Sequence, residues 1–238
     1  MKLSFANDRV LAVMAHPDDA ELLCAGTLAR ARADGAAIAI CIMCSGDKGK
    51  GASTKDVDLA EIRCDEATAA ADVIGAQLYW QGGRDGELFD STDERSGLIE
   101  AYRKFKPTLV ITHSPEDYHA DHRATSAIAE AASWFAASRG HVTKGWDALN
   151  GPPALWYADT VQMTGFSPGF LVDVSAHVET KKQMLKCHRS QLERGADGDF
   201  TPLSELMIQQ CRARGAQCGV AAAEAFRWHH AFKRVLAF

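Results

Sequence analysis

The sequence predicts an α/β fold, a Rossmann-like three-layer arrangement in which helices cover both faces of a mostly parallel sheet. Two observations predict it. Short apolar runs without polar alternation recur along the chain, which is typical of strands buried on both faces. Segments with helical spacing separate these runs, and such strand–helix alternation is the pattern of a doubly wound parallel sheet.

The first unit shows the pattern in detail. Residues 10–15 form an apolar strand that Pro17 ends. Residues 20–33 have the spacing of a single helix, with Arg30 and Arg32 in its last turns and Asp34-Gly35 as its stop signal.

The remaining elements follow the same logic. Strands are expected at residues 37–44, 77–80 and 108–112, and two further apolar segments lie at 154–157 and 170–174. Helices are expected at residues 57–74, 96–105, 122–137, 177–191 and 203–214. Residues 138–153 are rich in Gly and Pro and are predicted to be a connection, and residues 195–202 a loop. We therefore expect a single domain over 1–238, with a core at 1–137 and a C-terminal elaboration at 138–238.

Composition excludes several classes of function. The 238 residues carry 26 Lys+Arg and 31 Asp+Glu, a net charge of −5, so no basic face for nucleic acid is expected. The longest strongly apolar stretch, residues 36–44, is far shorter than the roughly 20 residues of a membrane span. Seven cysteines, an odd number in a chain of this length, indicate a reducing compartment. The sequence thus predicts a cytoplasmic protein that binds neither nucleic acid nor membrane.

Ionisable residues gather where the first strand ends. Residues 16–21 read His-Pro-Asp-Asp-Ala-Glu. Helix capping by Asp18 or Asp19, with Glu21 in the first turn, would account for the acids but not for His16. Because loops after parallel strands meet at one edge of the sheet, this loop is a candidate site.

The loop after the fourth strand, residues 113–122, contains three more histidines, His113, His119 and His122. Histidines facing a His-Pro-Asp-Asp loop predict a metal site without thiolate ligands, which favours zinc or another first-row divalent ion. Two His and one carboxylate would leave a position for water, and the second carboxylate could act as general base. Spacing does not decide which of the three histidines is a ligand.

These two motifs, residues 16–21 and the His-Ala-Asp-His at 119–122, resemble those of the PIG-L/LmbE-like family of zinc-dependent N-acetylglucosaminyl deacetylases, which includes enzymes of the bacillithiol and mycothiol pathways. Supporting matches lie at residues 45–49, 61–66, 84–86, 182–191 and 224–227. One departure is Ala120, where the family usually has Pro; it removes no chemical group.

The resemblance implies a role for each residue of the two motifs. It makes His16, Asp19 and His122 the metal ligands, Asp18 the general base, and His119 the general acid or oxyanion stabiliser. Asp121 would orient a histidine, and Arg63 and Asp85 would bind the anionic and hydroxyl groups of the substrate. It leaves His113 as a pocket-lining or structural residue. His188 stands in one of the matching segments, and we expect it at the edge of the pocket or in a subunit contact rather than in direct catalysis.

The expected activity is hydrolysis of the N-acetyl group of an N-acetylglucosamine-type small glycoconjugate. Zinc is the expected cofactor, with iron or manganese as alternatives, and the resemblance implies a homo-oligomer. A non-catalytic metal- or sugar-binding module is the alternative from another class. Within hydrolases, a de-N-acylase of an antibiotic, a lipid-linked sugar or a chitin oligosaccharide is the other alternative.

Overall fold

The computed structural model describes residues 4–51, 58–194 and 202–231. A seven-stranded sheet with the order β3-β2-β1-β4-β5-β7-β6 runs through it. The strands are β1 (Arg9–Met14), β2 (Ala37–Cys44), β3 (Gln77–Gly83), β4 (Leu109–Thr112), β5 (Ala154–Ala158), β6 (Phe170–Asp173) and β7 (Ala223–Trp228). The first five pair in parallel, whereas β7 is antiparallel to both β5 and β6. The predicted mostly parallel α/β fold is therefore confirmed.

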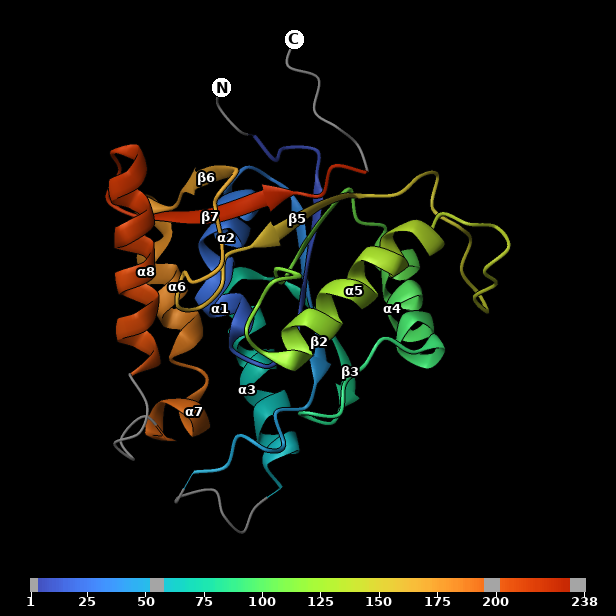
Figure 1. The fold of residues 1–238 in the computed structure, drawn as a ribbon, viewed down its shortest axis with the longest axis horizontal. Coiled ribbons are helices and arrows are strands. Elements are labelled where there is room, and N and C mark those ends of the chain that lie inside the picture. Colours follow the sequence, from blue (N-terminus) through green and yellow to red (C-terminus); the bar gives the residue numbers. More distant parts are fainter. Residues whose placement is uncertain (1–3, 52–57, 195–201, 232–238) are drawn as a thin grey trace.

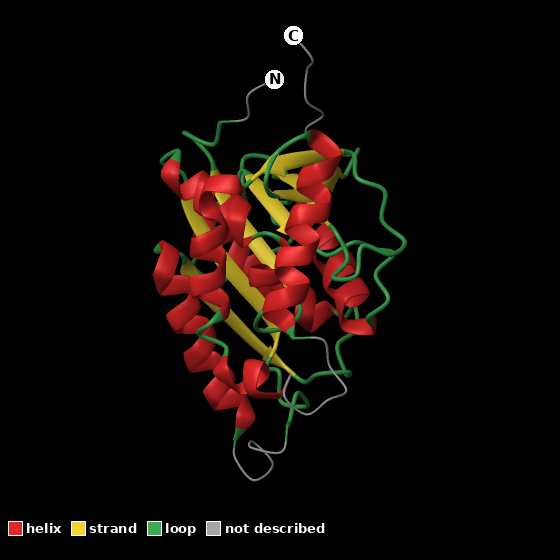
Figure 2. Cartoon of the chain, turned by 90° about the vertical axis from the view of Figure 1, so that its left-hand side faces the viewer, coloured by secondary structure: helices red, strands yellow, loops and turns green. Residues whose placement is uncertain are grey.

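Helices cover both faces of the sheet (Figures 1 and 2). They are α1 (Asp19–Leu23), α2 (Ala25–Ala33), α3 (Leu59–Ile74), α4 (Thr92–Phe105), α5 (Ala120–Phe135), α6 (Val178–Leu185), α7 (Arg189–Arg194) and α8 (Leu203–Cys218), with a 3₁₀ turn η2 at Ser175–His177. Alternate residues of β1 enter two separate cores, because successive side chains of a strand point to opposite faces. Val10, Ala12 and Met14 pack with α1, α2, α3, α6 and α8, and Leu11 and Val13 pack with α4 and α5.

The single helix expected at residues 20–33 is wrong, since the chain forms two helices that break at Cys24. The cause is tertiary. The buried Glu224 carboxylate accepts hydrogen bonds from the backbone N–H groups of Gly26 and Thr27 at the start of α2. The Lys181 ammonium donates to the carbonyl of Leu22 near the end of α1. A carboxylate at one helix start and a cation at one helix end stabilise both new termini.

The helix expected at 177–191 is also interrupted, between α6 and α7. The Glu66 carboxylate of α3 accepts from both the backbone N–H and the hydroxyl of Ser190, which anchors the start of α7. Strand β7 was not expected as a strand, because Glu224 and Arg227 interrupt its apolar pattern. Helix α4 starts earlier than expected because Ser91 caps it. The expected helix start at 57 and most of the expected loop at 195–202 lie outside the described residues.

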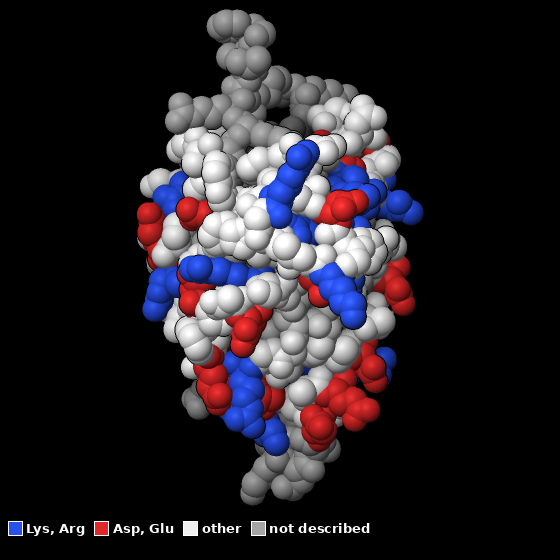
Figure 3. All heavy atoms as spheres, turned by 90° about the vertical axis from the view of Figure 1, so that its right-hand side faces the viewer, with Lys and Arg blue, Asp and Glu red and all other residues white. Residues whose placement is uncertain are grey.

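Strands β5, β6 and β7, from the predicted elaboration, share one sheet with the strands of the predicted core. Within the described residues, no helix is both long and apolar enough to cross a membrane. On the face drawn in Figure 3, the basic and acidic side chains are interspersed rather than gathered into one patch. Because ligand sites of open α/β sheets form at the carboxyl ends of the parallel strands, we expect the site at that edge.

Candidate active site and metal centre

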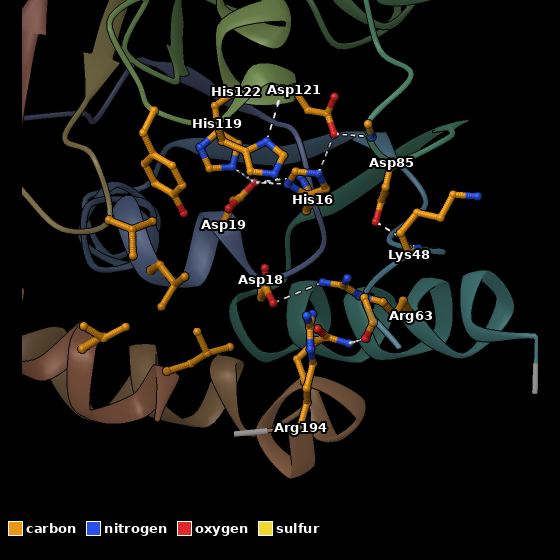
Figure 4. Close-up of a pocket in the computed structure, with 18 of the residues that line it drawn as sticks. His16, Asp18, Asp19, Lys48, Arg63, Asp85, His119, Asp121, His122 and Arg194 are labelled. Carbon is orange, nitrogen blue, oxygen red and sulfur yellow. Dashed lines mark hydrogen bonds and ion pairs between the residues drawn. The ribbon is translucent and has the colours of Figure 1, made fainter. Parts of the chain in front are cut away.

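A cavity of about 630 Å³ opens beside the loops that follow β1 and β4. Its walls contain all eight residues that sequence reasoning assigned to the site: His16, Asp18, Asp19, Arg63, Asp85, His119, Asp121 and His122. Residues that are more than 100 positions apart in the chain are thereby brought together, as Figure 4 shows. The parallel sheet is the reason, because it gathers the carboxyl ends of β1 and β4 at one edge.

Two histidines turn towards the carboxylate of Asp19. The distances from Asp19 Oδ2 to His16 Nδ1 and to His122 Nε2 are both 3.4 Å. The same oxygen accepts a 2.7 Å hydrogen bond from the backbone N–H of His16. That bond holds Asp19 in the site, although Asp19 lies in the first turn of α1.

For each of these two histidines, the second ring nitrogen lies close to another carboxylate, a different one in each case. His16 Nε2 lies 3.1 Å from Asp121 Oδ2, which also accepts from the backbone N–H of Gly86. His122 Nδ1 lies 3.2 Å from Asp117 Oδ1. A carboxylate on the far nitrogen of a metal-binding histidine fixes its tautomer and makes it a better ligand. Sequence reasoning had not assigned Asp117, although it precedes His122 by only five residues.

These carboxylates favour positive charge at the centre of the site. Burial lowers the pKa of His16, but hydrogen bonds to Asp121 and Asp19 outweigh it and raise the pKa to about 10. For His122, burial is likewise outweighed by the charge of Asp19 and the hydrogen bond to Asp117, which raise the pKa to about 9. The electrostatics that favour a proton on these nitrogens also favour a divalent cation between them and Asp19.

His113 is the competing candidate ligand, because its Nε2 lies 3.3 Å from Asp19 Oδ2. However, this nitrogen already accepts a 2.9 Å hydrogen bond from the backbone N–H of Ala15. The lone pair of Nε2 is therefore occupied by this hydrogen bond and is not available to a metal ion. The His113 ring is fully buried, and His113 does not line the cavity. Burial lowers the pKa of His113 to about 4, so the ring is neutral. A structural role for His113 fits these contacts.

Three groups of donor atoms within the described residues lie close enough for a metal ion, with every pair of atoms within 4.8 Å: His16/His119/His122, Asp19/His113/His122 and His16/Cys44/Asp121. The Cys44 group suits a metal poorly, because burial raises the pKa of this thiol strongly and a metal binds the thiolate. The other two groups share His122 and together contain His16 and Asp19. Nitrogen and carboxylate donors with an open cavity beside them fit a catalytic zinc or related divalent ion.

Asp18 has an unusual backbone conformation, with φ +106° at a residue that is not glycine. Such a conformation costs on the order of 1–3 kcal/mol and persists where the surroundings enforce it. The Asp18 side chain makes no capping bond; Asp18 Oδ2 lies 3.1 Å from Arg63 Nη2 and its carboxylate lines the cavity. Burial raises the pKa of Asp18 to about 6, although Arg63 opposes the shift.

The buried Arg63 guanidinium contacts more than Asp18. It donates to the carbonyl oxygens of Pro17 and Gly46 as well. These bonds clamp the loop after β1 to the loop after β2. The contacts in the structure thus give Arg63 a positioning role towards Asp18, and its predicted role in substrate binding stays a prediction.

His119 caps α5 and lines the cavity. Its Nδ1 accepts a 3.2 Å hydrogen bond from the backbone N–H of Asp121. In a neutral ring the proton therefore belongs to Nε2, which can donate a hydrogen bond into the cavity. Burial, with the neighbouring His122 and His16, lowers the pKa of His119 and favours this neutral form.

Further residues complete the cavity. Asp85 accepts from the backbone N–H groups of Gly46 (2.8 Å) and Lys48 (3.3 Å), which joins the loops after β2 and β3. Sequence reasoning had assigned no site role to Lys48, Tyr118, Gln191 or Arg194, which also line the cavity. His188 does not line it; the ring is fully buried and lies 3.4 Å from Glu21. No spacing pattern marked Tyr118 or Arg194, because only the fold brings them to the site.

Known proteins of similar sequence and structure include two deacetylases. A 1D-myo-inositol 2-acetamido-2-deoxy-alpha-D-glucopyranoside deacetylase of Mycolicibacterium gilvum is 27% identical over 82% of this chain and 85% of its own length. The structure of an N,N'-diacetylchitobiose deacetylase of Pyrococcus horikoshii is 26% identical, with a TM-score of 0.80 over 93% of this chain and 83% of that chain.

A 4-carboxy-2-hydroxymuconate hydratase of Pseudomonas putida has the same fold, with a TM-score of 0.83 over 97% of this chain and 99% of that chain at 22% identity. The fold alone therefore does not determine the reaction. The sequence model of one family, described as PIG-L: GlcNAc-PI de-N-acetylase, matches residues 11–133. That is just over half of the chain, which therefore belongs to the PIG-L family.

Proposed function

We propose that this protein is a metal-dependent hydrolase that removes the acetyl group from an N-acetylglucosamine-type amine of a small glycoconjugate. One observation carries the proposal. His16 and His122 direct their free nitrogens at Asp19, while the strained Asp18 stands beside them in the same cavity. This arrangement pairs a candidate divalent-cation site with a carboxylate that can accept a proton.

His16, Asp19 and His122 would hold the metal, and zinc is the ion that their donor atoms suit best. When bound, such an ion acidifies a water molecule and polarises the amide carbonyl. Iron or manganese could occupy the same donors. Metal analysis of the purified protein, followed by reconstitution with each ion, decides among them.

The protein's own groups would perform the proton transfers. Asp18, held by Arg63, accepts a proton from the attacking water. His119 would give a hydrogen bond from its Nε2–H, without releasing the proton, to the oxygen that becomes negative as the carbonyl carbon turns tetrahedral. When the C–N bond breaks, Asp18 returns the proton to the leaving amine, and the products are acetate and the free amino sugar. Asp85 and Lys48 face the side of the cavity where sugar hydroxyls would bind.

The decisive experiment is a panel of N-acetylated amino sugars, assayed for both acetate and primary amine with the zinc, iron and manganese forms in parallel. We expect stoichiometric release of both products from at least one glucosaminide. A protein that binds metal and sugars but releases no acetate across the panel would instead be a binding module. The proposed homo-oligomeric state is measured separately by light scattering during size-exclusion chromatography.

A further inference from the structure

The cavity has two chemically different sides. Lys48, Arg63, Asp85 and Gln191 are polar or charged and form one side, and Gln162 and Arg194 also line the cavity. In Figure 4, Lys48, Arg63 and Asp85 lie together on one side of the histidine cluster. Four aliphatic side chains form another part of the wall; they are Leu22, Val161, Leu203 and Leu206. A sugar and an acetyl group alone give this apolar wall little to bind.

Three separate elements build the apolar wall next to the metal ligands. Leu22 follows Asp19 by three residues in α1, and residues so spaced lie on the same face of a helix. Leu203 and Leu206 are also three residues apart, at the start of α8. Val161 comes from the loop after β5. The wall therefore begins at the helix that carries Asp19 and extends to α8.

Buried polar contacts hold the two outer parts of this wall together. Gln210 of α8 donates a 2.9 Å hydrogen bond to the carbonyl of Thr160, beside Val161. Arg214 Nε donates to Asp159 Oδ2 at 2.6 Å, and both side chains are almost fully buried. Leu206, Gln210 and Arg214 are spaced by four residues, so they share one face of α8. These bonds thus join α8, which carries Leu203 and Leu206, to the segment that carries Val161 before any ligand binds.

The geometry of an amide decides which part of the substrate meets this wall. The nitrogen and acyl substituents leave a planar carbonyl carbon in different directions. If the carbonyl lies at the metal and the sugar lies against the polar side, the acyl chain points away from the sugar. We propose that the apolar wall is an acyl-chain subsite, and that the enzyme removes linear N-acyl groups longer than acetyl in preference to acetyl itself. This inference rests on the proposed function.

The expected preference follows from burial of methylene groups. Each buried CH₂ contributes up to about a fourfold gain in kcat/KM, because about 0.8 kcal/mol of transfer free energy accompanies its burial. A hexanoyl chain has four more methylenes than acetyl, so partial burial against the wall should favour it by on the order of tenfold or more.

The test compares methyl glucosaminides that carry N-acetyl, N-butanoyl and N-hexanoyl groups, with released amine as the readout. We expect kcat/KM to rise along the series. A second series keeps the N-acetyl group and lengthens the alkyl aglycone from methyl to octyl. A rise only along the aglycone series would overturn the proposal, because the wall would then bind the aglycone. A fall from acetyl to hexanoyl would overturn it as well.

Variants of residues in α8 test whether the apolar wall causes the preference for longer acyl chains. Leu206→Ala should lower the ratio of hexanoyl to acetyl kcat/KM by about fivefold, since it removes aliphatic surface from the wall. Leu206→Gln keeps the length of the side chain and should lower the ratio similarly. Ile208→Ala is the matched control, because Ile208 is a partly buried aliphatic residue of the same helix that packs on the core and does not line the cavity. An unchanged ratio in both Leu206 variants contradicts the proposal.

Equilibrium binding separates this inference from the proposed function. In the metal-loaded Asp18→Asn variant, whose turnover is expected to be about 10²–10⁴-fold slower, calorimetry measures the Kd of each N-acyl glucosaminide. Tighter binding with longer acyl chains supports the subsite even if the wild-type protein hydrolyses none of them, which would refute only the proposed function. Hydrolysis of the acetyl substrate without any gain from chain length refutes only the subsite.

Discussion

Removal of the Glu224 carboxylate tests whether the break between α1 and α2 depends on a buried ion pair. Glu224 accepts from the backbone N–H groups of Gly26 (2.9 Å) and Thr27 (2.7 Å), and it pairs with the fully buried Lys181. Lys181 in turn donates to the carbonyl of Leu22 at 2.9 Å. Glu224→Ala therefore removes two acceptors from the start of α2 and leaves a buried ammonium without its counter-ion.

The expected loss follows from these two contributions. Breaking a buried pair by removing one partner costs about 3–5 kcal/mol, and loss of a helix cap costs about 1 kcal/mol. We therefore expect the free energy of unfolding to fall by about 4–6 kcal/mol. In a chain of this size each kcal/mol corresponds to about 2–4 °C, so the melting temperature should fall by about 10–20 °C.

Urea denaturation and calorimetry measure the loss. Glu179→Ala is the control, since it breaks the exposed Glu179–Lys182 pair on the same helix as Lys181 and should leave the melting temperature unchanged. The double variant Lys181→Met/Glu224→Leu should recover part of the stability, because apolar side chains replace a buried pair at little cost. A loss below about 1 kcal/mol in Glu224→Ala would refute the reasoning.

The same pair predicts a pH dependence. Burial lowers the pKa of Lys181, but the charge of Glu224 outweighs it and raises the pKa above its usual value. A raised pKa means that the contribution to stability is complete below the usual value of about 10.4 and is lost as the pH rises through the folded-state pKa. The stability difference between the wild type and the double variant should therefore stay constant from neutral pH until that range. A difference that declines near neutral pH would contradict this assignment.

The remaining predictions concern the site. Asp18→Asn should lower kcat by about 10²–10⁴-fold while metal content, measured by elemental analysis, stays at the wild-type level; loss of metal would make Asp18 a ligand. His122→Ala should lose metal, whereas His113→Ala should retain it and lose stability instead, because Ala15 loses its acceptor; the reverse result would make His113 the ligand. Gly46→Ala should reduce kcat/KM, because the added Cβ would lie 2.5 Å from Arg63 Nη1. Gly145→Ala is the control: Gly145 has a similar positive φ but no neighbour within 4 Å, so kcat/KM should stay unchanged.

Local pattern predicted most of the sheet. Strands β1, β2 and β4 are buried on both faces. Almost all of their residues are therefore apolar, and this continuous apolar run is recognisable in the sequence. β7 escaped prediction because it carries Glu224, whose partners Gly26, Thr27 and Lys181 lie far from it in the chain. The break at Cys24 was not predicted either, because it also depends on Glu224. Local helical spacing continues through it, and a carboxylate about 200 residues away overrides that spacing.

Sequence by itself predicted the candidate site, because most of its histidines and carboxylates are concentrated in two short segments that follow two buried strands. Tertiary structure decided the rest. It turned His16 and His122 towards Asp19, assigned Asp121 and Asp117 to hold them, and committed His113 to the backbone of Ala15. It also placed Leu203 and Leu206 of α8 in the wall of the same cavity. These outcomes depend on distances between segments far apart in the chain, which packing determines and local residue pattern does not encode.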